Sequence, residues 1–178
     1  MDRMKNNLSP RYTFETFMVD DTNRFAVKAA QTVAQKPIST DFSPFNPLFI
    51  YGESGVGKTH LLHAIRHYIN INHQSLRISF IDCESCSELS LKLKEACCDS
   101  DVLLFDNFQC ITYGNFSGEN LFLAFNTIYR SKKLMVFTSN RSPKAIPNLD
   151  ERLIAMLAQG FVVDFSPPNF ENKFTNTP

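Results

Sequence analysis

A glycine-rich loop constrains the fold of this chain more than any other part of its sequence. The loop reads Gly52-Glu53-Ser54-Gly55-Val56-Gly57-Lys58-Thr59. This order matches the P-loop pattern, which joins a strand to a helix and wraps backbone N–H groups around phosphates. An apolar run at 48–51 precedes the loop and helical apolar spacing at 58–71 follows it, as the pattern requires. The motif therefore predicts a nucleotide site in a domain built of a sheet and helices.

The residue types of the loop predict how a nucleotide would be bound. Gly52, Gly55 and Gly57 allow positive φ angles and a close approach of the backbone to phosphate. Lys58 is expected to contact the β- and γ-phosphates, and the Thr59 hydroxyl to coordinate Mg²⁺. The helix that begins at Lys58 adds the positive end of its dipole. We therefore expect ATP and Mg²⁺ as cofactors.

A carboxylate at the end of another predicted strand is expected to complete the metal site. Asp106 directly follows the apolar run at 102–105. Ligands of parallel sheets bind at the carboxyl ends of the strands, where the P-loop also lies. Asp106 is therefore predicted to bind Mg²⁺ together with Thr59, as a Walker-B aspartate does.

The residue after Asp106 separates an ATP-binding domain from an active hydrolase. A carboxylate at this position would polarise the attacking water, but the sequence has Asn107. An amide can orient water but cannot take its proton, and loss of a general base costs roughly 10²- to 10⁴-fold in rate. We expect ATP binding with weak or no hydrolysis, and we assign no catalytic residue.

Asn140 is a second polar residue at the end of a predicted strand, 134–138. It is a candidate sensor of the γ-phosphate and so joins the predicted nucleotide-binding residues. It could equally be a turn former before Arg141-Ser142-Pro143. The sequence leaves both interpretations open.

Strand and helix patterns alternate along the chain. Strands are predicted at 48–51, 77–82, 102–105, 134–138 and 161–165, and helices at 23–35, 58–71, 87–97, 121–129 and 150–157. Apolar strands alternating with helices predict an α/β fold of three αβα layers around a parallel five-stranded sheet. We divide the chain into a lead-in and linker at 1–46, a P-loop NTPase core at 47–166 and a flexible tail at 167–178.

Composition excludes several classes of function. Lys plus Arg and Asp plus Glu number 18 each, which argues against strong direct DNA binding. Every apolar run is too short to cross a bilayer, and the polar N-terminus does not resemble a signal peptide. An odd count of 5 cysteines argues against a secreted disulfide framework and favours the cytoplasm.

Histidines and cysteines are present in numbers that raise the question of a further metal. His60, His63 and His67 share one face of the predicted helix, without an acid or a thiol to complete a ligand set. We interpret them as a packed helix face. The cysteines at 83, 86, 97 and 98 lack zinc-finger spacing, so the sequence predicts no zinc site.

Several short sequence segments together resemble the AAA+ ATPase domain of the bacterial DnaA/Hda family. They are Ser-Pro-Arg-Tyr-Thr-Phe-Glu-Thr-Phe at 9–17, Asn-Arg-Phe-Ala at 23–26, Phe-Asn-Pro-Leu-Phe-Ile-Tyr-Gly at 45–52 and Leu-Asp-Glu-Arg-Leu at 149–153. Members of this family bind ATP, assemble on the replication origin and open the duplex for helicase delivery. The resemblance implies that residues near Phe17 and Asn23 border the adenine, and that Asn140 fills the first sensor position.

The chain departs from the family pattern at four points. Asn107 replaces the second Walker-B acid, and Met156 stands where the family has an arginine finger. The segment 84–100 is shorter than the initiator-specific helices require. The chain also stops before the family's helical lid and helix-turn-helix DNA-binding domain. These departures predict a monomer or a weak oligomer that ATP does not assemble.

Three functions remain open on this sequence. The leading one is an ATP-binding regulator or accessory factor of chromosomal replication initiation, acting through the replication initiator or the replicative helicase. The second is a DnaC-like helicase-loader adaptor. The third is a non-functional remnant of an initiator.

Overall fold

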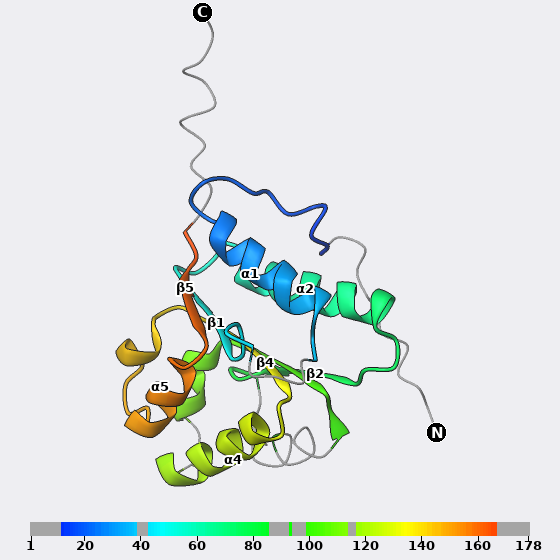
Figure 1. Ribbon diagram of the computed structural model, residues 1–178. Coiled ribbons are helices and arrows are strands. Elements are labelled where there is room, and N and C mark those ends of the chain that lie inside the picture. The colour runs from blue at the N-terminus through cyan, green and yellow to red at the C-terminus, as the bar shows by residue number, and fades with distance from the viewer. Residues whose placement is uncertain (1–11, 39–42, 86–92, 94–98, 114–116, 167–178) are drawn as a thin grey trace, which may run out of the picture.

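The computed structural model describes residues 12–38, 43–85, 93, 99–113 and 117–166 (Figure 1). In chain order the elements are α1 (Arg24–Gln35), β1 (Leu48–Tyr51), α2 (Lys58–Asn72), β2 (Ile78–Asp82), β3 (Val102–Asp106), the 3₁₀ turn η1 (Phe108–Tyr113), α4 (Gly118–Arg130), β4 (Leu134–Ser139), the 3₁₀ turn η2 (Pro143–Ala145), α5 (Glu151–Leu157) and β5 (Phe161–Asp164).

The five strands form one sheet in the order β2-β3-β4-β1-β5. Every neighbouring pair is parallel, so all carboxyl ends lie along one edge of the sheet. The predicted parallel five-stranded sheet is confirmed. Its order places the end of β1, where the P-loop begins, beside β4, and the end of β4 beside β3. Residues far apart in the sequence therefore meet at this edge.

Helices cover both faces of the sheet, which confirms the predicted three layers. Helices α1 and α2 lie over one face, while α4 and α5 lie over the other (Figure 1). Side chains alternate between the two cores: Leu103 and Phe105 of β3 join the α4 and α5 side, and Val102 and Leu104 join the α1 and α2 side. This alternation explains why β3 is apolar from Val102 to Phe105, since both of its faces are buried.

A cluster of phenylalanines fills the core below α4 and α5. The rings of Phe105 and Phe137 stack with centroids 4.8 Å apart, and Phe49, Phe108 and Phe125 pack around them. Each of these five side chains is completely buried. Such aromatic contacts contribute about 0.5–1.5 kcal/mol each beyond the burial of area. This cluster anchors β3 and β4 directly beneath the candidate site.

The predicted elements agree with the structure except at some ends. Helix α4 begins at Gly118 rather than 121, because Ser117 caps it by accepting a hydrogen bond from the Asn120 N–H at 3.2 Å. The helix predicted over 87–97, apart from residue 93, and the predicted tail over 167–178 fall outside the described residues. Among the helices that the structure describes, none has the length and apolar character to cross a membrane.

Asn46 connects the start of β1 to the start of β4 through its side chain. Its amide Nδ2 donates to the Lys133 carbonyl at 2.9 Å, and its Oδ1 accepts from the Met135 N–H at 3.0 Å. We expect Asn46→Ala to lower the free energy of unfolding by about 1–3 kcal/mol, because two backbone groups lose their partner. Urea unfolding measures this.

The exposed Asn120, whose side chain makes no such bridge in the described structure, provides the control for Asn46. Asn120→Ala is expected to change stability by less than about 0.5 kcal/mol. Equal unfolding midpoints for the two variants would show that the bridge contributes nothing.

Candidate nucleotide site

The P-loop adopts the backbone conformation that its glycines predict. Gly55 has φ 83° and Gly57 has φ 106°, in the left-handed region that favours glycine. Gly57 is also the N-cap of α2, so the helix starts directly after the loop. At Gly52 a Cβ atom would lie 2.1 Å from the Phe165 carbonyl oxygen, so only glycine fits there. The loop is thus held between β1, α2 and the residue that follows β5.

A cavity of about 250 Å³ opens beside the loop. Its lining combines the P-loop with residues that follow β3 and β4, and consists of Ser54, Gly55, Gly57, Lys58, Thr59, Asn107, Gln109 and Asn140. The structure therefore brings together most of the residues that the sequence singled out separately. Gln109, from η1, is a lining residue that the sequence reasoning missed.

Lys58 lies at the cavity with its ammonium on the loop itself. Its Nζ donates to the carbonyl oxygens of Gly52 at 2.8 Å and Glu53 at 2.6 Å. Burial lowers the pKa of Lys58, and the negative charge of Asp106 partly opposes this effect. A desolvated ammonium at the mouth of a glycine loop is a favourable partner for a phosphate.

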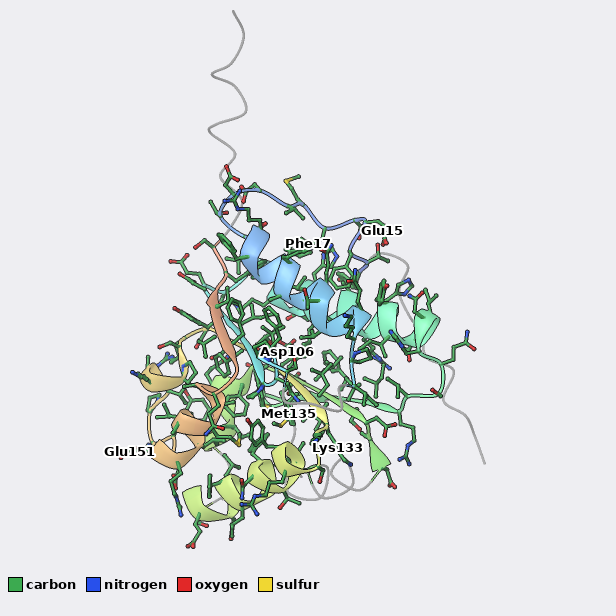
Figure 2. All side chains as sticks on the ribbon, viewed as in Figure 1. Glu15, Phe17, Asp106, Lys133, Met135 and Glu151 are labelled. Carbon is green, nitrogen blue, oxygen red and sulfur yellow. The ribbon has the colours of Figure 1, made fainter. Side chains whose placement is uncertain are left out.

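Asp106, the acid of the site, lies in the interior of the molecule (Figure 2). Its side chain is buried, with 4% exposed. Its Oδ2 accepts a hydrogen bond from the Thr59 hydroxyl at 2.8 Å. Its Oδ1 accepts from the backbone N–H of Asn107 at 3.1 Å and from the hydroxyl of Thr138, in β4. Thr138 was not predicted, because nothing in the sequence indicates that β4 lies next to β3.

Thr59 and Asp106 fit a magnesium ion by the chemistry of their donors. Mg²⁺ takes hard oxygen ligands and is bound in proteins by one or two carboxylates plus phosphate and water. The Thr59 hydroxyl, which lines the cavity, and the Asp106 carboxylate, which it contacts directly, are such a set, although Asp106 is not itself a lining residue. No group of three or more His, Cys, Asp or Glu side chains that could hold a metal occurs in the described part of the chain.

Asn107 is held in an uncommon backbone conformation with φ 53°, which asparagine tolerates better than most residues. Its side-chain Nδ2 donates to Asp82 Oδ1 at 3.1 Å. Burial pushes the pKa of Asp82 upward, but hydrogen bonds from Ser85, Asn107 and the backbone of Glu84 outweigh burial and lower it. The end of β2 therefore supplies an ionised carboxylate to Asn107.

Asn140 lies at the cavity, but two of its polar groups already have partners. Its backbone N–H donates to Gln109 Oε1 at 3.1 Å, and its Oδ1 accepts from Arg141 Nε at 3.1 Å. Its amide Nδ2 is the group that remains to face a phosphate. A sensing role for Asn140 stays a prediction.

Met156 belongs to α5, packs in the core and is only 4% exposed. The neighbouring Arg152 forms two hydrogen bonds with Asp150, at 3.0 and 2.7 Å, and lies over the ring of Phe122. These bonds from Arg152 lower the pKa of Asp150 to about 2. The helix position that the resemblance assigns to an arginine finger is thus an apolar packing position in this chain.

The two residues that the resemblance places near an adenine have different surroundings. The ring of Phe17 packs against His60, with centroids 4.8 Å apart, and against Phe165 at 5.8 Å. Asn23 is completely buried, and its side chain bonds to the Asp20 N–H and the Met18 carbonyl. Asn23 therefore shapes the turn before α1. Neither residue lines the cavity.

The histidines of α2 pack against aromatic rings, as the helix-face interpretation expects. The His63 ring stacks on Phe80 at 4.6 Å and on Tyr12 at 5.6 Å. The His60 ring also contacts Tyr12, and its Nε2 donates to the Thr13 carbonyl oxygen at 3.2 Å. Cys83 is buried, and burial raises the pKa of Cys110; the cysteines at 86, 97 and 98 lie outside the described residues.

Comparison with known families agrees with the geometry of this site. A family model described as the bacterial DnaA ATPase domain matches residues 8–164. The chain is 40% identical over 177 residues to the chromosomal replication initiator protein DnaA of Caldanaerobacter subterraneus subsp. tengcongensis, covering 94% of this chain. It covers 39% of that relative, so the chain spans about two fifths of the length of the curated relatives that it matches.

Solved structures show the same similarity. Domain III of the Thermotoga maritima DnaA superimposes with a TM-score of 0.77 at 34% identity, covering 90% of this chain and 69% of that one. AMPPCP-bound DnaA from Aquifex aeolicus gives a TM-score of 0.75 at 27% identity, covering 92% and 53%. A DnaC helicase loader has a TM-score of 0.61 at 19% identity, covering 88% and 97%, which shows a shared fold alone.

Proposed function

Because the chain belongs to the bacterial DnaA ATPase-domain family, we propose that it binds ATP together with Mg²⁺ and takes part in the initiation of chromosomal replication. The observation that supports ATP binding most directly is the contact of Thr59 with Asp106 beside the P-loop cavity. A relative of known structure binds AMPPCP, an ATP analogue. Lys58, Thr59, Asp106 and the loop glycines are the proposed binding residues.

Mg²⁺, when bound, would neutralise phosphate charge, and Thr59 and Asp106 are the residues proposed to hold it. The remaining parts of the site act on the nucleotide. The loop would offer its backbone N–H groups to phosphate, as P-loops do, and Lys58 would offer a cation. Asn107 and Asn140 line the same cavity and offer amides. Since Asn107 cannot take a proton from water, we propose weak or no hydrolysis.

ATP binding and its dependence on Mg²⁺ can be tested by changing the two proposed ligands. We expect Asp106→Asn and Thr59→Ala to remove most of the affinity that Mg²⁺ adds, about 10- to 100-fold, because a charge-assisted contact contributes about 1.5–3 kcal/mol. Calorimetry with Mg²⁺ and with a chelator measures this difference. Thr59 is exposed, so its variant keeps the test valid if loss of the buried Asp106 charge impairs folding.

The control for these variants is Asp99→Asn. Asp99 is exposed, and its ion pair with Arg77 is long, at 3.9 Å. This variant loses the same charge and is expected to bind ATP as the native chain does. If Asp106→Asn and Thr59→Ala retain the full effect of Mg²⁺, the proposed metal site is wrong.

We further propose that the chain acts on initiation through a protein partner, as a monomer or a weak oligomer. Two observations support this proposal. The net charge of zero gives the chain no general attraction to DNA, and the buried Met156 has no charge at the position that the resemblance assigns to an arginine finger. The structural likeness to a helicase loader concerns the fold alone, so no observation favours the loader function.

Partner capture distinguishes the remaining functions. Native chain is mixed with full-length initiator or with replicative helicase, in the presence of ATP and Mg²⁺, and complexes are separated by size. Binding to the initiator is the expected result. Binding to the helicase only would replace this proposal with the loader function, and binding to neither would favour a remnant.

A further inference from the structure

The side chain of Asn107 is hydrogen-bonded to a carboxylate on a different strand, Asp82, and this bond determines how the Asn107 amide is oriented. Asp82 ends β2, and the register of the sheet places it opposite Asp106 of β3. The Asn107 side chain reaches across this gap, so that its Nδ2 donates to Asp82 Oδ1 at 3.1 Å. An acid and an amide therefore lie side by side at the edge of the sheet that borders the cavity.

The charge of Asp82 fixes the direction of the Asn107 amide. An ionised carboxylate only accepts hydrogen bonds, so the amide must present its NH₂ group to Asp82. The carbonyl oxygen Oδ1 is then the end of the amide that is left to accept a hydrogen bond at the cavity. The backbone is held as well, because the Asn107 N–H donates to Asp106 Oδ1 at 3.1 Å.

The position of the Asp82 carboxylate is fixed by further hydrogen bonds. Its Oδ2 accepts from the Ser85 hydroxyl at 2.7 Å, and its Oδ1 also accepts from the Glu84 N–H at 3.1 Å. These bonds favour the ionised form of the carboxyl group. The carboxylate therefore has a defined position before any nucleotide binds.

We propose that Asp82 is a positioning residue, which turns the Asn107 carbonyl oxygen toward the cavity so that it accepts a hydrogen bond from the water next to the γ-phosphate. This inference rests on the proposed ATP binding. In an ATPase with an acid after its Walker-B aspartate, the carboxylate would face this water directly. In this chain the carboxylate belongs to Asp82 on the neighbouring strand β2, and the Asn107 amide is the group that contacts the water.

The arrangement predicts that a single replacement cannot create an efficient base. Asn107→Asp would place two carboxylates about 3 Å apart, where their repulsion displaces one of them or favours its protonation. Exchanging both residues, D82N/N107D, restores one acid and one amide. The carboxylate introduced at position 107 then takes a proton from the water, whose oxygen bonds to the γ-phosphorus while the bond to the β-phosphate oxygen breaks, giving ADP and phosphate.

Turnover and ATP affinity of four proteins test the inference: the native chain, N107D, D82N and D82N/N107D. We expect D82N/N107D to hydrolyse ATP at least about 10-fold faster than N107D, within the roughly 10²- to 10⁴-fold that a general base contributes. D82N should bind ATP within about 2-fold of the native affinity, because it leaves the ATP contacts intact. Equal turnover of N107D and D82N/N107D, whether fast or undetectable, overturns the inference.

Glu84 offers a matched control. It is an exposed acid two residues from Asp82, so E84Q/N107D removes a nearby negative charge without restoring an amide partner. This variant should hydrolyse ATP no faster than N107D. Rescue by E84Q/N107D equal to that by D82N/N107D would show that only net charge matters, and would overturn a positioning role.

Thermal unfolding provides a readout without ATP. N107D should unfold about 2–8 °C below D82N/N107D, since the repulsion exists only in the single variant. Equal unfolding temperatures overturn the coupling of the two residues.

Failure of the proposed function and failure of this inference can be distinguished. Absence of ATP binding in the native chain would overturn the proposed function. ATP binding with equal turnover of N107D and D82N/N107D would overturn only the pairing of Asp82 with Asn107.

Discussion

Lys58→Ala is expected to lower ATP affinity by about 10- to 150-fold, the largest functional effect of any single change. Hydrogen bonds to charged groups contribute about 1.5–3 kcal/mol, and Lys58 is the cation that lines the cavity. Its ammonium now bonds to the carbonyls of Gly52 and Glu53, so a bound phosphate would replace or share these contacts. Calorimetry with ATP and Mg²⁺ measures the loss.

Lys28→Ala is the control for this prediction. Lys28 is exposed on α1 and is not among the residues that line the cavity, and its loss removes the same charge from the chain. ATP affinity should then remain within about 2-fold of native, as for surface changes in general. If Lys58→Ala binds ATP as tightly as Lys28→Ala, the cavity beside the P-loop is not the nucleotide site.

Gly160→Ala is expected to destabilise the fold by about 3 kcal/mol, the largest effect on stability. An added Cβ would lie 1.9 Å from the Pro47 carbonyl oxygen and 2.6 Å from the Pro47 nitrogen, so backbone must move. The same carbonyl accepts the Phe161 N–H at 2.9 Å, which aligns β5 with β1. Overpacking usually costs about 1–3 kcal/mol, more where backbone is displaced. Thermal unfolding should show a decrease of roughly 6–12 °C.

Gly118→Ala makes the same chemical change where the chain has room. A Cβ at Gly118 would lie 3.4 Å from side-chain atoms of Asp150, near ordinary contact distance. Because Gly118 opens α4, alanine should alter stability by less than about 1 kcal/mol. Unfolding temperatures that decrease equally in both variants would contradict the close approach of Gly160 to β1.

The fold was predictable from the sequence because its patterns are local. The apolar run before the P-loop and the helical spacing after it lie within a few residues, and they set β1 and the start of α2. The P-loop glycines have the positive φ angles that their positions require. Among the helices and strands that the structure describes, the predictions differ at element ends, as at α4, which Ser117 caps and which starts earlier than predicted.

Only part of the candidate site could be predicted from the sequence. Lys58, Thr59, Asp106 and Asn107 were singled out from the sequence, since each belongs to a short motif next to a strand or loop. The structure then added Thr138, Gln109 and Asp82, whose importance depends on which strands are neighbours. Sheet order is a property of the whole chain, so no local pattern indicates that β2 and β4 both flank β3.

The sequence by itself therefore determined the layered α/β class, the P-loop and the amide at position 107. Only the tertiary structure decided that Asn107 is bonded to Asp82 and that Met156 is buried. The physical reason is the range of the interactions. Glycine conformation and apolar spacing act between residues that are close along the chain, whereas a hydrogen bond between β2 and the end of β3 forms only after the strands have paired.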